Sequence, residues 1–376
     1  MLNVARHRIL GLLAAVMLLA GCQYDSIVNQ VREETRRNDS LAISFGNGVI
    51  DNPVKTRALS LLSQHTNTMG VWGWQTTTDQ MEVQLFNNHL VSFDQDANDW
   101  TYTPARYWEK GSSYRFYAYA PNSTTVPGTS VSINKGTGRI IINNVVLEGN
   151  NTMSAAPRPQ PYGTFSSVTD VDWLVDREGK TVNPEQTGSQ VTFNMQHILA
   201  KLIVMVTPSN TINESGVTVI LDSLSIGQFY SKADFTQILD HSPVIGIESD
   251  ESAQEWQIDT TCTTYALHSV YGAEIDSAGC CVIESLILPH QADSTQNILI
   301  HYSLHYQDGR VQHFDSRLAL QDAFSVFNSA NSYTLHLIVG PQVITFNAGA
   351  TLWDKEEWSG WWKIAEGTLI NVINKN

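Results

Sequence analysis

The sequence predicts an all-β protein with two β-sandwich-like units in series. It has 376 residues, of which 42% are hydrophobic and 16% charged, enough for one large or two ordinary domains with buried cores. Its 10 Trp, 13 Tyr and 12 Phe favour strands, and no long run of Glu, Lys and Leu has a helical period. Its 24 Gly and 12 Pro separate short runs of β-branched and aromatic residues. This composition excludes a disordered chain and a coiled coil.

The chain is acidic. Lys and Arg number 22 and Asp and Glu 37, which gives a formal charge of −15 at pH 7. A groove that follows nucleic-acid phosphates needs clustered basic residues, so we expect no nucleic-acid partner.

Residues 1–21 have the pattern of a lipoprotein signal peptide. Arg6 and Arg8 precede an apolar run over residues 9–20, and the segment ends in Leu19-Ala20-Gly21-Cys22. The run is too short to span a bilayer. Small residues before the cleaved bond fit a tight peptidase site, and the Cys22 thiol is the group that accepts a diacylglycerol. An ordinary signal peptide that happens to contain a cysteine is the alternative.

Cleavage before Cys22 removes two Arg and no acidic residue, so the mature chain has a formal charge of −17. Residues 22–40 are polar with mixed charge, which is typical of a tether between the lipid and the first domain.

The first β unit is predicted over residues 41–185. In the run 113–120, each of the two faces of the expected strand carries aromatic side chains, so we expect both faces to be covered. A Pro-rich loop follows at 149–165, and the break at 177–189 sets the boundary. The expected strands are 41–45, 70–74, 81–86, 90–93, 113–120, 139–146 and 171–175.

The second β unit is predicted over residues 186–353, with a helical turn at 195–200. Its expected strands are 191–193, 201–207, 217–226, 255–259, 281–288, 297–306, 310–318, 333–339 and 342–346. Residues 354–376 then form a Trp-rich C-terminal tail. Because Trp358, Trp361 and Trp362 lie beyond the last clear strand, we interpret them as candidate partner-binding aromatics.

Three cysteines remain once Cys22 is lipidated, namely Cys262, Cys280 and Cys281. Export to an oxidising compartment permits a disulfide, but adjacent cysteines cannot both pair with one partner. One thiol therefore stays unpaired, or none pairs. The spacing lacks the doubled C-x-x-C of a zinc site.

No motif of catalysis or nucleotide binding is present, neither a G-x-S-x-G elbow, nor H-E-x-x-H, nor a Walker loop. We therefore expect no enzyme, no cofactor and no metal. His301 and His305 alternate with Ser303 along one face of an expected strand, and a polar outer face explains them better than a metal site. Eight of the 20 residues from Trp100 to Tyr119 are aromatic. Core packing is favoured over stacking on sugars for these rings.

Several short segments, taken together in their order along the chain, form a recognisable pattern. After Cys22 come Leu41-Ala42-Ile43-Ser44-Phe45 and Lys55-Thr56-Arg57-Ala58; then Trp100-Thr101-Tyr102, Tyr107-Trp108 and the run from Tyr114 to Pro121; then His197-Ile198-Leu199-Ala200-Lys201-Leu202; and finally Tyr333-Thr334-Leu335 and Ile344-Thr345-Phe346 before Trp353. In order and spacing these segments resemble the fimbrillins, the lipoprotein-precursor subunits of type V pili in Gram-negative bacteria, and their fimbrillin-like relatives. The Trp-rich tail and the double Cys depart from the commonest form, which leaves the subunit type open.

The resemblance implies two transthyretin-like β-sandwich domains in tandem and no enzymatic activity. It also implies export as a lipoprotein to the outer membrane, with an acylated, palmitate-bearing Cys22 in the lipid and a place at the cell surface. An arginine-specific protease would then cleave after the first strand. The chain would polymerise by strand exchange with other fimbrial subunits, as a homo- or heteropolymer.

The candidate cleavage site is Arg57, in a turn-prone stretch after a removable strand, with Arg36 and Arg37 as rivals. A merely solvated loop arginine is the alternative. His197 is interpreted as a structural residue that orients a turn.

The candidate donor strand lies in residues 368–373, where apolar residues alternate. Its candidate residues are Leu369, Ile370, Val372 and Ile373. A terminal strand that folds back on its own domain explains the same pattern.

The sequence thus predicts a structural and adhesive subunit of a cell-surface fimbrium. The alternatives are a monomeric surface lipoprotein that binds a glycan or a host protein, and a non-polymerising anchor or tip component. No nucleophile or paired-base motif favours a secreted hydrolase. The choice among shaft, anchor and tip stays open, as does the receptor.

Overall fold

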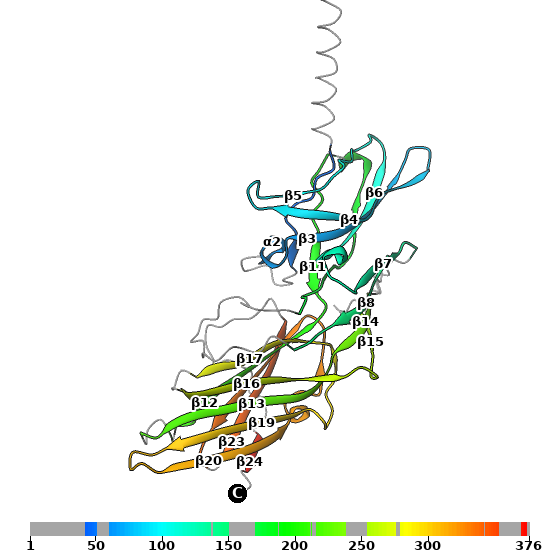
Figure 1. The fold of residues 1–376 in the computed structure, drawn as a ribbon. Coiled ribbons are helices and arrows are strands. Elements are labelled where there is room, and N and C mark those ends of the chain that lie inside the picture. Colours follow the sequence, from blue (N-terminus) through cyan, green and yellow to red (C-terminus); the bar gives the residue numbers. More distant parts are fainter. Residues whose placement is uncertain are drawn as a thin grey trace, which may run out of the picture.

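The computed structural model describes residues 42–50, 60–136, 138–149, 170–186, 188–210, 212, 216–237, 254–275, 279–341, 343–352 and 370–373. This described part is almost entirely β structure, as the sequence predicted (Figure 1). Helix α2 (Leu62–His65) is a single turn. Within these residues, no helix has the length and apolar character needed to cross a membrane.

The first sheet has nine strands in the order β2-β1-β11-β9-β6-β3-β4-β5, with β10 paired to β6. All its pairings are antiparallel except that of β1 with β11. Its strands are β1 (Val49–Ile50), β2 (Ser60–Leu61), β3 (Thr68–Thr76), β4 (Glu82–Asp94), β5 (Asp99–Thr101), β6 (Ser113–Ala120), β9 (Leu174–Asp176), β10 (Lys180–Val182) and β11 (Asn194–His197).

Two glycines of β3 allow aromatic rings to lie directly against its backbone. A Cβ at Gly70 would stand 2.2 Å from the ring of Tyr119, and one at Gly73 would stand 2.8 Å from both Phe86 and Phe116. No real Cβ fits at these distances, so larger residues at either position would displace the rings. Phe86 and Phe116 can therefore fill the first core, the apolar cluster around Phe45, while Tyr119 packs in the cluster of Trp72 and Trp173.

A four-stranded sheet joins the two halves of the chain, in the order β15-β14-β8-β7. It pairs β7 (Ser130–Asn134) and β8 (Arg139–Val146) with β14 (Lys232–Gln237) and β15 (Gln254–Ile258). Figure 1 shows this sheet between the first sheet and the larger β assembly that carries the C-terminal strands. Its buried side chains share one apolar cluster with Trp72, Trp173 and Leu286.

The remaining strands form a β-sandwich. One sheet has the order β17-β12-β22-β23-β24 and the other β16-β13-β19-β20. Both contribute to one core, with Leu202 and Leu335 from the first and Leu224 and Tyr302 from the second. The strands are β12 (Ala200–Pro208), β13 (Thr218–Tyr230), β16 (Thr264–Ile275), β17 (Cys280–Ile287), β19 (Asn297–His305), β20 (Val311–Ala319), β22 (Asn331–Val339), β23 (Val343–Leu352) and β24 (Ile370–Ile373), with a small pair β18 (His290–Gln291) and β21 (Val326–Phe327).

The helical turn predicted at residues 195–200 is wrong. Asn194–His197 is strand β11, which pairs with β9, and β12 begins at Ala200. Residues 195–200 are all buried, the polar Gln196 and His197 included, so the segment is covered on both sides and shows neither a helical nor a strand alternation. Strands β7, β14 and β16 were not predicted from the sequence.

The predicted division at residue 185 stays a prediction, as does the transthyretin-like topology of each unit. In the structure β11 follows this position and belongs to the first sheet. Likewise β14 pairs with β8 of the first half, and β15 pairs with β14. The two halves are therefore joined by shared sheets as well as by the chain itself.

Asp176 lies in β9 at the meeting point of these sheets. Its side chain is 2% exposed, and the Asn194 main-chain N–H donates to its Oδ1 at 3.2 Å. Gln237 at the end of β14 donates to the Asp176 main-chain oxygen at 2.8 Å. Burial raises the pKa of the Asp176 carboxyl from 3.8 to about 7.

We predict that Asp176 makes stability fall as pH rises from about 4 to about 7. Over that window the native state keeps a proton that the unfolded state has released, so the folded form is penalised progressively as the carboxyl ionises. Urea unfolding at pH 5 and pH 8 should show a loss on the order of 2 kcal/mol for the parent chain that Asp176→Asn lacks. An equal pH dependence in both chains would contradict this assignment.

Candidate functional site around the buried N-terminal segment

Residues 42–50 run as an extended segment through the first sheet. The Ile43 N–H donates to the Arg106 carbonyl at 2.8 Å on one side. On the other side the Gly46 N–H donates to the Val191 carbonyl, and the Val191 N–H donates to the Ser44 carbonyl, both at 2.8 Å. The expected strand at 41–45 is thus present as isolated bridges, and regular pairing begins only at β1. The segment therefore lies between two other segments of the same chain, around Arg106 and Val191.

Phe45 anchors this segment in an aromatic core. Its ring is fully buried and lies 5.4 Å from Phe86, 5.6 Å from Tyr102, 5.9 Å from Phe193 and 6.1 Å from Phe116, measured between ring centroids. Three of these four pairs are edge-to-face, a favourable geometry for aromatic rings. A large share of the first core therefore depends on one residue of the N-terminal segment.

Polar contacts fix the position of the segment along its length. The Tyr102 hydroxyl donates to the Ile43 carbonyl at 2.8 Å, and burial raises the pKa of this hydroxyl. Asn47 Nδ2 donates to Ser63 Oγ at 2.7 Å, while the Ser63 N–H donates back to Asn47 Oδ1 at 3.1 Å. These bonds hold the segment in one register.

The aromatic cluster expected between residues 100 and 119 is core packing. Trp100, Trp108, Tyr114 and Tyr119 are all buried, whereas Tyr107 is exposed. These buried rings offer no surface on which a sugar could stack.

The candidate donor residues Ile370, Val372 and Ile373 lie in β24, which pairs antiparallel with β23 at the edge of its sheet. In this structure the C-terminal strand thus lies on its own chain. Leu369 lies outside the described residues.

The other predicted site residues also lie outside the part of the chain that the structure describes, so they stay predictions. They are Cys22, Arg36, Arg37, Arg57, Trp358, Trp361 and Trp362.

The cysteines of the second half have separate surroundings. The Cys262 thiol is free and donates to Asp259 Oδ2 at 3.2 Å, which raises the pKa of Cys262 and contributes to lowering that of Asp259 to about 2. Cys280 is buried in β17, with its sulfur 3.8 Å from the Val206 carbonyl oxygen. Cys262 therefore forms no disulfide here.

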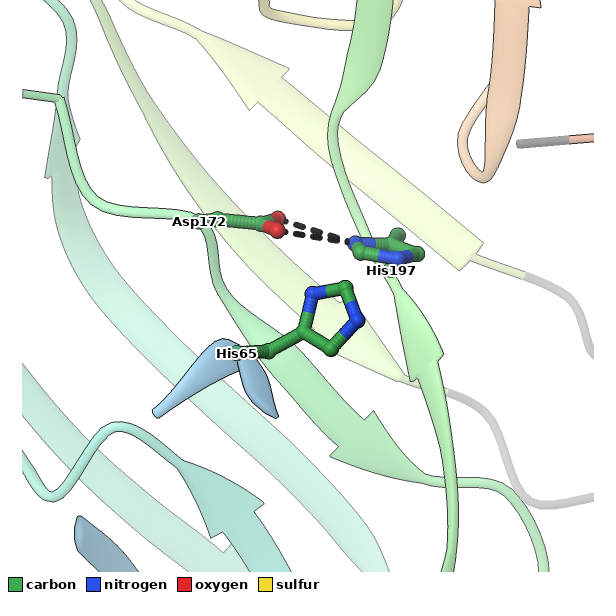
Figure 2. Close-up of side chains that lie close together, drawn as sticks. All are labelled: His65, Asp172 and His197. Carbon is green, nitrogen blue, oxygen red and sulfur yellow. Dashed lines mark hydrogen bonds and ion pairs between the residues drawn. The ribbon is translucent and has the colours of Figure 1, made fainter. Parts of the chain in front are cut away.

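A second group of polar side chains lies close together in space and was not expected from the sequence. His65 from the end of α2, Asp172 from the approach to β9, and His197 from β11 come together (Figure 2). His197 is 1% exposed, and its Nδ1 lies 3.0 Å from each carboxylate oxygen of Asp172. The rings of His65 and His197 have centroids 5.7 Å apart and cross at 71°. His197 was interpreted from the sequence as a structural residue, and its contacts with His65 and Asp172 were not expected, because no local motif connects the three residues.

Comparison with known proteins supplies the family. A sequence model described as fimbrillin-like matches residues 56–353. The solved structure of a fimbrial protein from Bacteroides vulgatus is similar, with 13% identity, a TM-score of 0.54, and cover of 83% of this chain and 99% of that one. At this identity the likeness shows a shared fold.

The tip fimbrial protein Mfa3 from Porphyromonas gingivalis is a more distant match, with 10% identity, a TM-score of 0.34, and cover of 77% of this chain and 95% of that one. Among curated proteins no sequence matches significantly. Since the fimbrillin-like model covers most of the sequence, and the described fold agrees with it, this chain belongs to the fimbrillin-like family.

Proposed function

We propose that this protein is a structural subunit of a cell-surface fimbrium. In this proposal it is exported as an outer-membrane lipoprotein through Cys22 and assembles by strand exchange after proteolysis removes its N-terminal segment. The observation that carries the proposal is the position of residues 42–50, a segment that precedes β2 and packs in the core of the first sheet. Family membership supports the fimbrial role.

Removal of this segment would leave two kinds of unsatisfied surface. The backbone groups of Arg106 and Val191 would lose their partners, and the rings of Phe86, Phe116 and Phe193 would lose the Phe45 ring. An extended chain with apolar side chains at alternate positions satisfies both at once, because it offers backbone hydrogen bonds and side chains together. While residues 42–50 stay in place they exclude such a chain.

The order of the residues selects among the candidate cleavage sites. Arg57 follows the buried segment and precedes β2, so cleavage there separates residues 42–50 from the rest of the chain. Cleavage at Arg36 or Arg37 would leave the segment attached and the core closed. The strand-exchange proposal therefore requires Arg57 or a site near it.

The proposed donor is the C-terminal strand. β24 is an edge strand with β23 as its neighbour in the sheet order, so its release breaks one row of pairings. Ile370 and Val372 are two positions apart and so share one face of an extended chain. Before assembly, pairing with β23 would keep this strand from other molecules.

A monomeric surface lipoprotein that binds a glycan or a host protein, or a non-polymerising anchor or tip, remains the alternative. The observation behind it is the group Trp358, Trp361 and Trp362 in the tail. An uncleaved chain that begins at lipidated Cys22 on cells would favour this alternative.

We predict that Arg57→Ala blocks maturation. After treatment with an arginine-specific protease, the parent chain should begin at Ala58 by intact mass and give an oligomer ladder on a native gel, while the variant should stay monomeric. The matched control is the double variant Arg36→Ala/Arg37→Ala, which should mature as the parent does. A ladder from the Arg57 variant would exclude this cleavage site.

Phe45→Ala should destabilise only the uncleaved chain. Loss of a buried phenylalanine typically costs about 3–5 kcal/mol, which urea unfolding of the precursor measures. Met81→Ala, at a position 61% exposed, is the control and should change stability by about 0.5 kcal/mol or less. Because cleavage discards residue 45, the cleaved Phe45 variant should polymerise as well as the cleaved parent chain. A polymerisation defect in the cleaved Phe45 variant would argue against replacement of this segment.

Substitutions in the C-terminal strand should affect polymerisation and leave cleavage unchanged. The double variant Ile370→Asn/Val372→Asn should still be cleaved but should lose the ladder, because polar side chains do not fill an apolar groove. Asn371→Ser, which changes the intervening position, should keep it. An unchanged ladder from the double variant would show that another segment is the donor.

A further inference from the structure

We infer that His65, Asp172 and His197 form a binding site for a divalent transition-metal cation, with Zn²⁺ as the reference ion. The nitrogen or oxygen atoms that these side chains can offer all lie within 4.8 Å of one another. Figure 2 shows the His65 ring beside both the His197 ring and the Asp172 carboxylate. The inference does not depend on the proposed fimbrial function.

The side chains must move closer together to hold an ion. Ligands bound tetrahedrally at about 2.0–2.2 Å from zinc lie about 3.3 Å from one another, whereas the donor atoms here lie within 4.8 Å. The Asp172 oxygens and His197 Nδ1, 3.0 Å apart, share a hydrogen bond, so an ion bound by this pair displaces the shared proton to solvent. His65 is the exposed member and ends a single helical turn, so its side chain can make the remaining adjustment by rotation.

One side of the candidate metal site is buried and held in place, and the other side is exposed to solvent. His197 is held in β11, which pairs with β9 through His197 and Leu174, two residues after Asp172. Burial of His197 keeps its ring in one orientation. The exposed side of His65 gives a dissolved cation access to the site.

The donor set determines the class of ion. Two imidazole nitrogens and one carboxylate oxygen suit zinc and its first-row neighbours, whereas magnesium and calcium prefer oxygen ligands. All three ligands follow Arg57 in the sequence. A chain cleaved there would therefore keep the complete site.

The test is calorimetric titration of the full chain, purified without a histidine tag and freed of metal with a chelator. We expect one Zn²⁺ per chain and no binding of Mg²⁺ at the same concentration. Titration with Co²⁺ should give the visible bands of a nitrogen and oxygen site without the near-ultraviolet thiolate band. A thiolate band would assign the ion to the cysteines and overturn the proposal.

His65→Gln is the decisive variant because His65 is exposed and its replacement leaves the core intact. Loss of this ligand should weaken zinc binding by about tenfold or more. Asp172→Asn should weaken it as well. His301→Gln is the matched control, since His301 is also exposed and lies 2.6 Å from Asp315 outside any such cluster of described residues. Absence of zinc binding in the parent, unchanged affinity in the His65 variant, or an equal loss in the His301 variant would overturn the proposal.

Discussion

The packing of Phe45 among Phe86, Phe116 and Phe193 is the interaction on which the first sheet depends. Protein cores are close-packed, so a ring at the centre of such a group cannot be lost without leaving a void. The neighbouring backbone groups are hydrogen-bonded to residues 43–49, and buried backbone groups require such partners. Core volume and backbone pairing therefore restrict this position to an extended chain with an apolar side chain in the place of Phe45.

Local sequence patterns correctly predicted the strands that show a strand pattern in their own residues. The expected ranges 113–120 and 139–146 coincide with β6 and β8, because each run of apolar and aromatic residues is bounded by turn residues. The pattern failed at residues 195–200, where tertiary burial on both sides gives the sequence no strand alternation. It also failed for β14, where only Ala233 and Phe235 are apolar, and for β16, where polar residues and Gly272 interrupt the apolar ones.

The candidate site also has a part that the sequence could predict and a part that it could not. The burial of residues 42–50 could be anticipated from a short apolar run near the chain start, although the aromatic partners of Phe45 could not. His65, Asp172 and His197 lie far apart in the sequence and come from a helical turn, a loop and a strand. Only the pairing of β9 with β11 brings two of them together, and no spacing rule encodes that pairing.

The pairing of β8 with β14 has a consequence for the order in which the chain folds. A chain made from its N-terminus presents β7 and β8 long before β14 exists, since Ile141 pairs with Thr236. Until then one edge of β8 carries open backbone groups, a surface on which other chains can pair wrongly. Contacts between such distant residues also slow folding, because a long loop must close first. The sheet of β7, β8, β14 and β15 therefore completes its fold late, and until residue 236 is present the edge of β8 stays open to wrong pairing.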